Sequence, residues 1–306
     1  MRITTDTESP DFVSVIIPTY NRAHSLGRAM RSVLAQTYTN LELIIADDAS
    51  TDETENLVRS IDDPRIVYVR QPENRGASAA RNLGLARARG PLIAFQDSDD
   101  EWLLDKLEMQ IKAISEAGPE FGATFGVKLI YGHDENYVYG EGRTCVAPDI
   151  DRPVASGDLT GQLIHGNLIS PQTLMVRADV ARKVGGFDER LPCNNDWEYM
   201  LRLSKVTQIQ HTPFPVVVAY ISDDSIHRNV RSKARSFLLI LKKHSDLFEQ
   251  DYKAYAGKLF AAGRWLHKLG RHRAAAICMW KAIQLAPGRP KPWLGFLQSR
   301  SYHAFS

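Results

Sequence analysis

Three aspartates, Asp97, Asp99 and Asp100, directly follow an apolar run at residues 91–95. An apolar run of this length that ends in acids predicts a buried β-strand whose last residues reach a cleft. Because ligands in open α/β sheets bind off the carboxyl ends of strands, chemistry is expected at this point. Carboxylates two residues apart repel each other unless a cation lies between them, and oxygen ligands suit Mg²⁺ or Mn²⁺. The pattern predicts either a Mg²⁺ or Mn²⁺ site completed by substrate phosphates or simply a polar loop after a strand.

Two earlier apolar runs also end in residues suited to ligand binding. Residues 12–17 are followed by Tyr20, and residues 41–46 are followed by Asp48. An aromatic ring can stack on a base, a carboxylate can accept a hydrogen bond from the base, and a metal-binding pair can hold a diphosphate. The strand ends together therefore predict a nucleoside-diphosphate site. The chain has no G-x-G-x-x-G after its first strand and no P-loop pattern, which argues against dinucleotide binding and against a P-loop protein.

The residues around these motifs alternate between the periodicities of strands and helices. Apolar residues recur at helical spacing over residues 26–34. Ser50 and Glu53 form a capping-box pattern that predicts the start of a second helix. A strand at 66–69 and an Ala-rich helix at 77–88 precede the acidic strand. This alternation predicts an α/β fold with a doubly wound, mostly parallel sheet over the first hundred residues.

Beyond the acidic strand, one further carboxylate is a candidate for chemistry. Asp196 lies where a helix is predicted to begin, and a carboxylate at that point can serve as a helix cap. The alternative is that Asp196 faces the cleft as a base. The other elements predicted in this part are a helix at 106–117, a strand at 121–131, a loop and flap at 132–159 and a helix at 177–184.

The composition is that of a globular protein with an apolar core, at 43% hydrophobic and 24% charged residues in a chain of 306. Its three cysteines lie far apart without a C-x-x-C spacing, which favours a reducing compartment over a disulfide framework or a zinc site. Residues 1–11 are polar, are expected to be flexible and lack a signal-peptide core, and no apolar run approaches the ~18 residues of a membrane span. We therefore expect a cytoplasmic protein whose membrane contact, if it has any, is peripheral at the inner face.

A net charge of +2 hides a strong asymmetry along the chain. Residues 226–306 hold 16 Lys and Arg against three Asp and Glu, so the remainder of the chain is acidic. A basic tail on an acidic body predicts a contact with phosphates, anionic lipid or an acidic protein partner, or else a merely solvated basic helical face. Apolar and small residues in this tail are spaced as in one tetratricopeptide unit or a generic helical hairpin. Trp293 and its apolar neighbours between basic residues suit a membrane interface.

Six short motifs in the same order resemble family 2 glycosyltransferases of the GT-A fold. The resemblance covers about residues 12–228, and it predicts three regions: a flexible N-terminus at 1–11, a catalytic domain at 12–228 and a basic helical region at 229–306, which is TPR-like or a generic hairpin. The motifs are Val-Ser-Val-Ile-Ile-Pro-Thr-Tyr-Asn-Arg22, Ala-Asp-Asp-Ala-Ser-Thr-Asp52, Asn-Arg-Gly-Ala-Ser-Ala-Ala-Arg-Asn82, Asp-Ser-Asp-Asp100, Gly-Gly-Phe-Asp-Glu189 and Asn-Asp-Trp-Glu198.

The resemblance implies a role for each matching residue. It makes Asp196 the general base and Asp97, Asp99 and His227 the metal ligands. Asp99 is the more direct ligand of the two aspartates, and His227 is the counterpart of a basic-plus-His element. It implies that the remaining nucleotide-sugar site is formed by Pro18, Thr19, Tyr20, Arg22, Asp48, Arg81 and Ser98. The family usually has Glu before the base, whereas Asn195 stands here, so any role of that Glu is lost or has moved to Glu198.

The implied activity is that of an inverting, Mg²⁺- or Mn²⁺-dependent hexosyltransferase. It would move one sugar from a nucleoside-diphosphate donor, by family habit a UDP-sugar, to a hydroxyl of a glycan or a lipid-linked acceptor in cell-surface or extracellular polysaccharide assembly. No nucleic acid partner is expected. Two other interpretations remain: a nucleotide-sugar-binding module without activity, and a phosphatase or phosphotransferase that uses the Asp-x-Asp pair.

Overall fold

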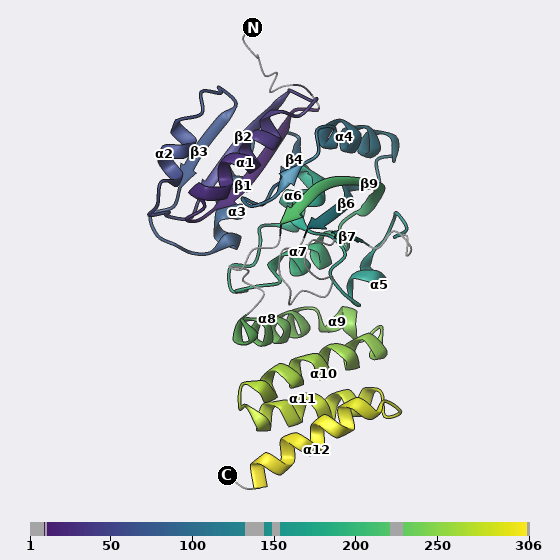
Figure 1. Ribbon diagram of the computed structural model, residues 1–306. Coiled ribbons are helices and arrows are strands. Elements are labelled where there is room, and N and C mark those ends of the chain that lie inside the picture. Colours follow the sequence, from purple (N-terminus) through teal and green to yellow (C-terminus); the bar gives the residue numbers. More distant parts are fainter. Residues whose placement is uncertain (1–8, 10, 132–143, 149–153, 221–228, 305–306) are drawn as a thin grey trace.

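The computed structural model describes residues 9, 11–131, 144–148, 154–220 and 229–304, and one mixed sheet runs through its first two-thirds (Figure 1). The strand order is β3-β2-β1-β4-β8-β6-β9-β5, with β7 paired to β6. The first four strands in the chain are parallel neighbours, as the alternating pattern predicts. Their bounds, with the helices between them, are β1 Val13–Thr19, α1 Ala23–Leu34, β2 Leu41–Asp47, α2 Thr54–Arg59, β3 Ile66–Arg70, α3 Ala77–Arg87 and β4 Leu92–Phe95.

The second half of the sheet is mixed, because β8 runs antiparallel to both β4 and β6, while β6 and β9 are parallel. The antiparallel strand β8 therefore joins the parallel strands β1 to β4 to the remaining strands of the sheet. The elements of this half are β5 Glu101–Trp102, α4 Lys106–Glu116, β6 Phe121–Tyr131, β7 Thr144–Ala147, α5 Thr160–Leu163, the 3-10 turn η1 Pro171–Thr173, β8 Leu174–Arg177, α6 Ala178–Val184, α7 Asn195–Leu203 and β9 Gln208–Tyr220.

Alternating side chains of the parallel strands enter two separate cores, as the period of two in a β-strand requires. Val15 and Ile17 of β1 pack with the apolar side of α1, whereas Ile16 between them packs with residues of α6 and α7 on the opposite face. Helix α3 crosses that second face at close range. A Cβ on Gly84 of α3 would lie 2.4 Å from the side chain of Ile16, so the glycine allows this approach.

In the part of the chain that the structure describes, five helices follow β9. They form a stack on the far side of α7 from the sheet (Figure 1). They are α8 Val230–Lys243, α9 Ser245–Phe248, α10 Tyr252–Lys268, α11 His272–Leu285 and α12 Pro290–Ala304. Aromatic contacts join the first of them to the sheet domain, since the ring of Trp197 lies 5.2 Å from that of Phe237 and 6.1 Å from that of Phe248. Whether α10 and α11 form a tetratricopeptide unit stays a prediction.

Two local predictions from the sequence are wrong. The capping box is not formed: α2 begins at Thr54, and the hydroxyl of Ser50 instead accepts a hydrogen bond from the amide of Asn21 at 2.9 Å. The segment 132–159 is not all loop, because β7 at Thr144–Ala147 pairs antiparallel with β6. Most of residues 1–11 and the segment that contains His227 lie outside the described residues.

Candidate active site

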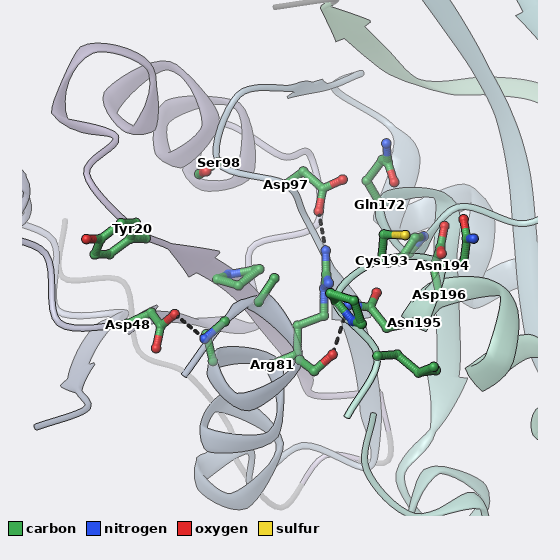
Figure 2. A pocket seen from close by; sticks show the side chains of 18 of the residues that line it. Tyr20, Asp48, Arg81, Asp97, Ser98, Gln172, Cys193, Asn194, Asn195 and Asp196 are labelled. Carbon is green, nitrogen blue, oxygen red and sulfur yellow. Dashed lines mark hydrogen bonds and ion pairs between the residues drawn. The ribbon is translucent and has the colours of Figure 1, made fainter. Parts of the chain in front are cut away.

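A cavity of about 1540 Å³ opens at the carboxyl ends of β1, β2 and β4 and extends to the start of α7. Figure 2 shows its contents from close by, with Tyr20 and Asp48 at one side, Asp97 and Arg81 in the middle, and Asp196 at the other side. Every candidate site residue in the described part of the chain lines it: Pro18, Thr19, Tyr20, Arg22, Asp48, Arg81, Asp97, Ser98, Asp99 and Asp196. The structure therefore brings together residues that are up to 178 positions apart in the chain.

Asp48 is held in place by the loop that leads into α3. Its carboxylate accepts hydrogen bonds from the amide of Arg75 at 2.8 Å, the amide of Gly76 at 2.7 Å and the side chain of Gln71 at 2.8 Å. Burial raises the pKa of Asp48, and the two amide hydrogen bonds act in the opposite direction. A carboxylate oxygen accepts more than one hydrogen bond, so Asp48 retains capacity for a donor group on a ligand.

Tyr20 and Thr19 complete this side of the cavity. The ring of Tyr20 is 44% exposed and lies at the same side as Asp48 (Figure 2), where a planar base would find both a stacking surface and an acceptor. The hydroxyl of Thr19 is buried without a hydrogen-bond partner in the part of the chain that the structure describes. A buried hydroxyl left without a partner is unusual, which favours a ligand that supplies one.

Asp97 and Asp99 are the two acids that remain available for a cation. One oxygen of Asp97 accepts a hydrogen bond from the guanidinium of Arg81 at 2.8 Å, which fixes the carboxylate and leaves its second oxygen available. Burial raises the pKa of Asp99, and the negative charge of Asp97 raises it further. The guanidinium of Arg28 donates a hydrogen bond to the backbone carbonyl of Asp99 at 2.6 Å, which stabilises the turn that carries both acids.

Asp100, the third acid of the run, has a structural role. Its two oxygens accept hydrogen bonds from the amide of Tyr220 at 3.0 Å and from the side chain of Gln172 at 2.9 Å, and only 4% of the residue is exposed. Burial raises the pKa of Asp100 well above its usual range. Asp100 therefore ties the acidic turn to β9 and η1.

The oxygen donors of Asp97 and Asp99 fit a hard divalent cation such as Mg²⁺ or Mn²⁺. Among the described residues no group of three or more His, Cys, Asp and Glu is arranged to hold a metal ion. Two carboxylates alone make an incomplete coordination shell, which suits an ion completed by the phosphates of a ligand.

Asp196 lies in the first turn of α7, and its side chain does not cap the helix. The residue before the helix is Asn194, in a left-handed conformation at φ 54°, and no side chain caps the first turn. The carboxylate of Asp196 accepts a hydrogen bond from Asn167 at 2.7 Å and lines the cavity. The helix cap is therefore not formed, and the role of Asp196 as a base stays a prediction.

Glu198 does not line the cavity, so it cannot stand in for the Glu that Asn195 replaces. It is fully buried, and its carboxylate contacts Arg202 at 2.8 Å, Lys243 at 2.8 Å and His244 at 3.1 Å. These contacts lower the pKa of Glu198 to about 2 although burial alone would raise it. Glu198 joins α7 to α8.

The sequence does not point to several residues that complete the site. Arg75 and Gly76 belong to the motif at residues 74–82, in which only Arg81 has an expected role, and Asn167 carries no local signal because only folding places it beside Asp196. Lys233 and Arg235 line the same cavity although they belong to α8, in the basic tail. No helix among the described residues is long and apolar enough to cross a bilayer.

Comparison with known proteins agrees with this geometry. Residues 14–146 match the model of the family described as glycosyl transferase family 2. WfgD of Escherichia coli, a UDP-Glc:alpha-D-GlcNAc-diphosphoundecaprenol beta-1,3-glucosyltransferase, is 48% identical over 32% of this chain and 39% of its own length. The putative teichuronic acid biosynthesis glycosyltransferase TuaG of Bacillus subtilis is 44% identical over 37% of this chain and 45% of its own length. The uncharacterized glycosyltransferase RP339 of Rickettsia prowazekii is 32% identical over 64% of this chain and 60% of its own length. The chain thus spans between about two-fifths and three-fifths of the length of these relatives.

Two solved structures share the fold over nearly the whole chain. TarS 1–349 of S. aureus, in complex with UDP-GlcNAc, superimposes with a TM-score of 0.64 at 19% identity, over 95% of this chain and 91% of that one. The mannosyltransferase PcManGT of Pyrobaculum calidifontis, with GDP-Man and Mn²⁺, gives 0.61 at 21% identity, over 99% and 83%. The family match and the sequence relatives show that residues 14–146 belong to glycosyl transferase family 2, and the two solved structures show that the chain has the GT-A fold.

Proposed function

We propose that the chain is an inverting, metal-dependent hexosyltransferase that moves one sugar from a nucleoside-diphosphate sugar to an acceptor hydroxyl. The observation that carries the proposal is the order of groups across one cavity: a ring and carboxylate suited to a base, then a carboxylate pair suited to a metal diphosphate, then a separate carboxylate. A glycosidase would need two catalytic carboxylates around one sugar, whereas an inverting transferase needs only one base.

In this mechanism the base of the donor stacks on Tyr20 and donates a hydrogen bond to Asp48. Asp97 and Asp99 would hold a divalent ion, which would supply positive charge to the departing nucleoside diphosphate. Arg81 keeps Asp97 in the orientation for that task.

Asp196 takes the proton of the acceptor hydroxyl as the hydroxyl oxygen bonds to the anomeric carbon. The bond from that carbon to the phosphate oxygen breaks on the opposite side, and its electron pair leaves with the nucleoside diphosphate, which inverts the configuration. Asn167 donates to one oxygen of Asp196 and so orients the other toward the acceptor.

We propose a UDP-sugar as donor and a glycan or a lipid-linked sugar as acceptor, in cell-surface polysaccharide assembly. Support comes from similar proteins. The structural neighbour TarS binds UDP-GlcNAc, and the name of the relative WfgD gives UDP-Glc as donor and a diphosphoundecaprenol-linked sugar as acceptor. A location at the inner face of the membrane stays a prediction, which cell fractionation would test.

The proposal is tested by measuring nucleoside diphosphate released from UDP-sugars across a panel of acceptors, with Mn²⁺ and with EDTA. We expect release that depends on both metal and acceptor, and its loss in Asp99→Ala but not in Asp62→Ala, a control on an exposed loop. UDP binding without transfer to any acceptor would indicate a binding module instead. Release of phosphate from a phosphomonoester, without UDP, would indicate a phosphatase.

A further inference from the structure

Three of the cations that line the cavity are paired with acids. Arg75 contacts Glu189 at 2.7 Å, Arg81 contacts Asp97 at 2.8 Å, and Arg190 contacts Asp188 at 2.7 Å. These residues supply positive charge that the protein itself neutralises.

Three other lining cations form no ion pair with a carboxylate of the described residues. Lys128 of β6 donates to the hydroxyl of Ser170 at 2.7 Å, and Lys233 and Arg235 of α8 contact no acid. Lys233 is half-buried, and a cation that loses hydration without gaining a partner carries a free-energy cost. Of these three, Lys128 lies within electrostatic range of Asp100, so the positive charge without a carboxylate partner lies with Lys233 and Arg235, where α8 reaches the cavity.

The position of α8 places this charge at the Asp196 side of the cavity. The hydroxyl of Ser236, one helical turn from Lys233, accepts a hydrogen bond from the amide of Cys193 at 3.2 Å. Burial raises the pKa of the Cys193 thiol, and the charges of Asp196 and Lys233 both reach it, in opposite directions. Lys233 thus lies beside the segment that leads into α7, on the same side as the proposed base.

We propose that Lys233 and Arg235 form an anion subsite that holds a phosphate group carried by the acceptor. The inference rests on the proposed function and adds the class of acceptor, a phosphate-bearing sugar. Lys and Arg are the usual partners of phosphate oxygens, and charge-assisted hydrogen bonds are stronger than neutral ones.

The diphosphate of the donor is the other anionic group of the proposed reaction. The geometry of the cavity disfavours its binding to Lys233 and Arg235. Asp97 lies between the Tyr20 side and the Asp196 side (Figure 2), and Asp99, two residues further along the chain, lines the same cavity, so a donor that stacks on Tyr20 reaches this pair with its diphosphate. The cavity, at about 1540 Å³, exceeds the usual volume of a small-molecule pocket, roughly 300–1,000 Å³, and so has room for an acceptor beside the donor.

The full-length chain is first titrated with UDP and Mn²⁺ by calorimetry, and then, with UDP saturating, with N-acetylglucosamine 1-phosphate and glucose 1-phosphate. The methyl glycosides of the same sugars are the uncharged probes. We compare the wild type with the double variant Lys233→Gln, Arg235→Gln and with Lys242→Gln, an exposed lysine on the same helix that does not line the cavity.

We expect the wild type to bind at least one sugar phosphate more tightly than its methyl glycoside, and the double variant to lose roughly tenfold or more of that affinity. Lys242→Gln should stay within about twofold of the wild type, and UDP affinity should be the same in all three proteins. Equal binding of charged and uncharged probes, or equal binding by wild type and double variant, would overturn the inference. Weaker UDP binding by the double variant would also overturn it, because the cations would then serve the donor. Absence of UDP binding in the first titration would instead refute the proposed function.

Discussion

The aspartates of this site show that a residue's partners, more than its type, set what it can do. Asp48 accepts hydrogen bonds from two backbone amides, and Asp97 is paired with Arg81. Both carboxylate oxygens of Asp100 accept hydrogen bonds, one from the amide of Tyr220 and one from the side chain of Gln172. Asp99 is buried beside Asp97, which raises its pKa. The same type of side chain is therefore a structural tie at Asp100, while Asp48 is proposed to accept from a base and Asp97 and Asp99 to bind a cation.

At the residue scale, Asp196→Asn separates the base from the binding groups. We expect turnover to fall by roughly 10²- to 10⁴-fold, because the amide accepts no proton from the acceptor, while UDP affinity with Mn²⁺ changes by less than about twofold. Steady-state kinetics and calorimetry check the two parts. Asp62→Asn is the matched control. A variant with normal turnover and weakened UDP binding would reverse the roles assigned to Asp196 and to the nucleotide side.

Non-glycine residues with positive φ gather around the site. In the described residues they are Asn21, Ala49 and Asn194, which follow or precede the pocket-lining Tyr20, Asp48 and Asn195. A left-handed conformation costs a non-glycine residue roughly 1–2 kcal/mol, so the surrounding hydrogen bonds must hold these turns. The side chain of Asn21 contributes by accepting from the amide of Thr51 at 2.8 Å.

At the scale of elements, the close packing of α3 on β1 sets the position of Arg81. Gly84→Ala should destabilise the protein by about 1–2 kcal/mol, because overpacking against Ile16 outweighs the gain in helix propensity. Gly161→Ala, in a helix where a new Cβ meets nothing within 4 Å, is the control and should be neutral or stabilising. Urea unfolding measures both, and equal stability of the two variants would contradict this account of α3.

Glu198 makes the junction of α7 and α8 sensitive to acid. Its folded-state pKa of about 2 lies below the ordinary 4.5, so its stabilising contribution is complete above pH 4.5 and is lost as the pH falls toward 2. The size of the shift corresponds to about 3 kcal/mol.

The test is the free energy of unfolding measured between pH 6 and pH 2.5 in the wild type and in Glu198→Gln. We expect the free energy of unfolding of the wild type to fall more steeply than that of the variant as the pH decreases below 4.5. The difference in slope should correspond to the uptake of up to about one additional proton on unfolding. Parallel curves for the two proteins would mean that the pKa of Glu198 is not lowered by folding.

At the scale of the whole molecule, the C-terminal helices present apolar side chains to solvent beside basic ones. Trp280 and Trp293 pack edge to face at 6.3 Å, and Leu294 and Leu297 on the same helix as Trp293 are more than 60% exposed. Trp, Leu and flanking Lys or Arg suit an anionic membrane interface.

We therefore predict that the chain floats with vesicles that contain anionic lipid, and that the variant Trp293→Ser, Leu297→Ser floats less. Phe214→Ser, which removes an exposed aromatic ring on β9, should float like the wild type. Flotation independent of anionic lipid, or unchanged in the double variant, would remove the membrane from the account and leave a protein partner for this surface.

The sequence by itself determined the parallel half of the sheet and the residues at its strand ends. Strand burial and helix periodicity are local patterns, and the carboxyl ends of parallel strands meet at one edge whatever the rest of the fold does. Pro18, Tyr20, Asp48 and the Asp97–Asp99 pair were therefore predictable as neighbours. The family match supports the identification over residues 14–146.

Tertiary structure alone decided which partner each charged group received. The pairing of Asp196 with Asn167, the burial of Glu198 against α8 and the entry of Lys233 into the cavity all join segments that are distant in sequence. Such contacts leave no periodic trace, because they depend on how β8 and β9 turn the second half of the chain back onto the first. The acidic body and basic tail were visible as composition, but only folding placed two cations of the tail, Lys233 and Arg235, in the same cavity as the acids at the strand ends.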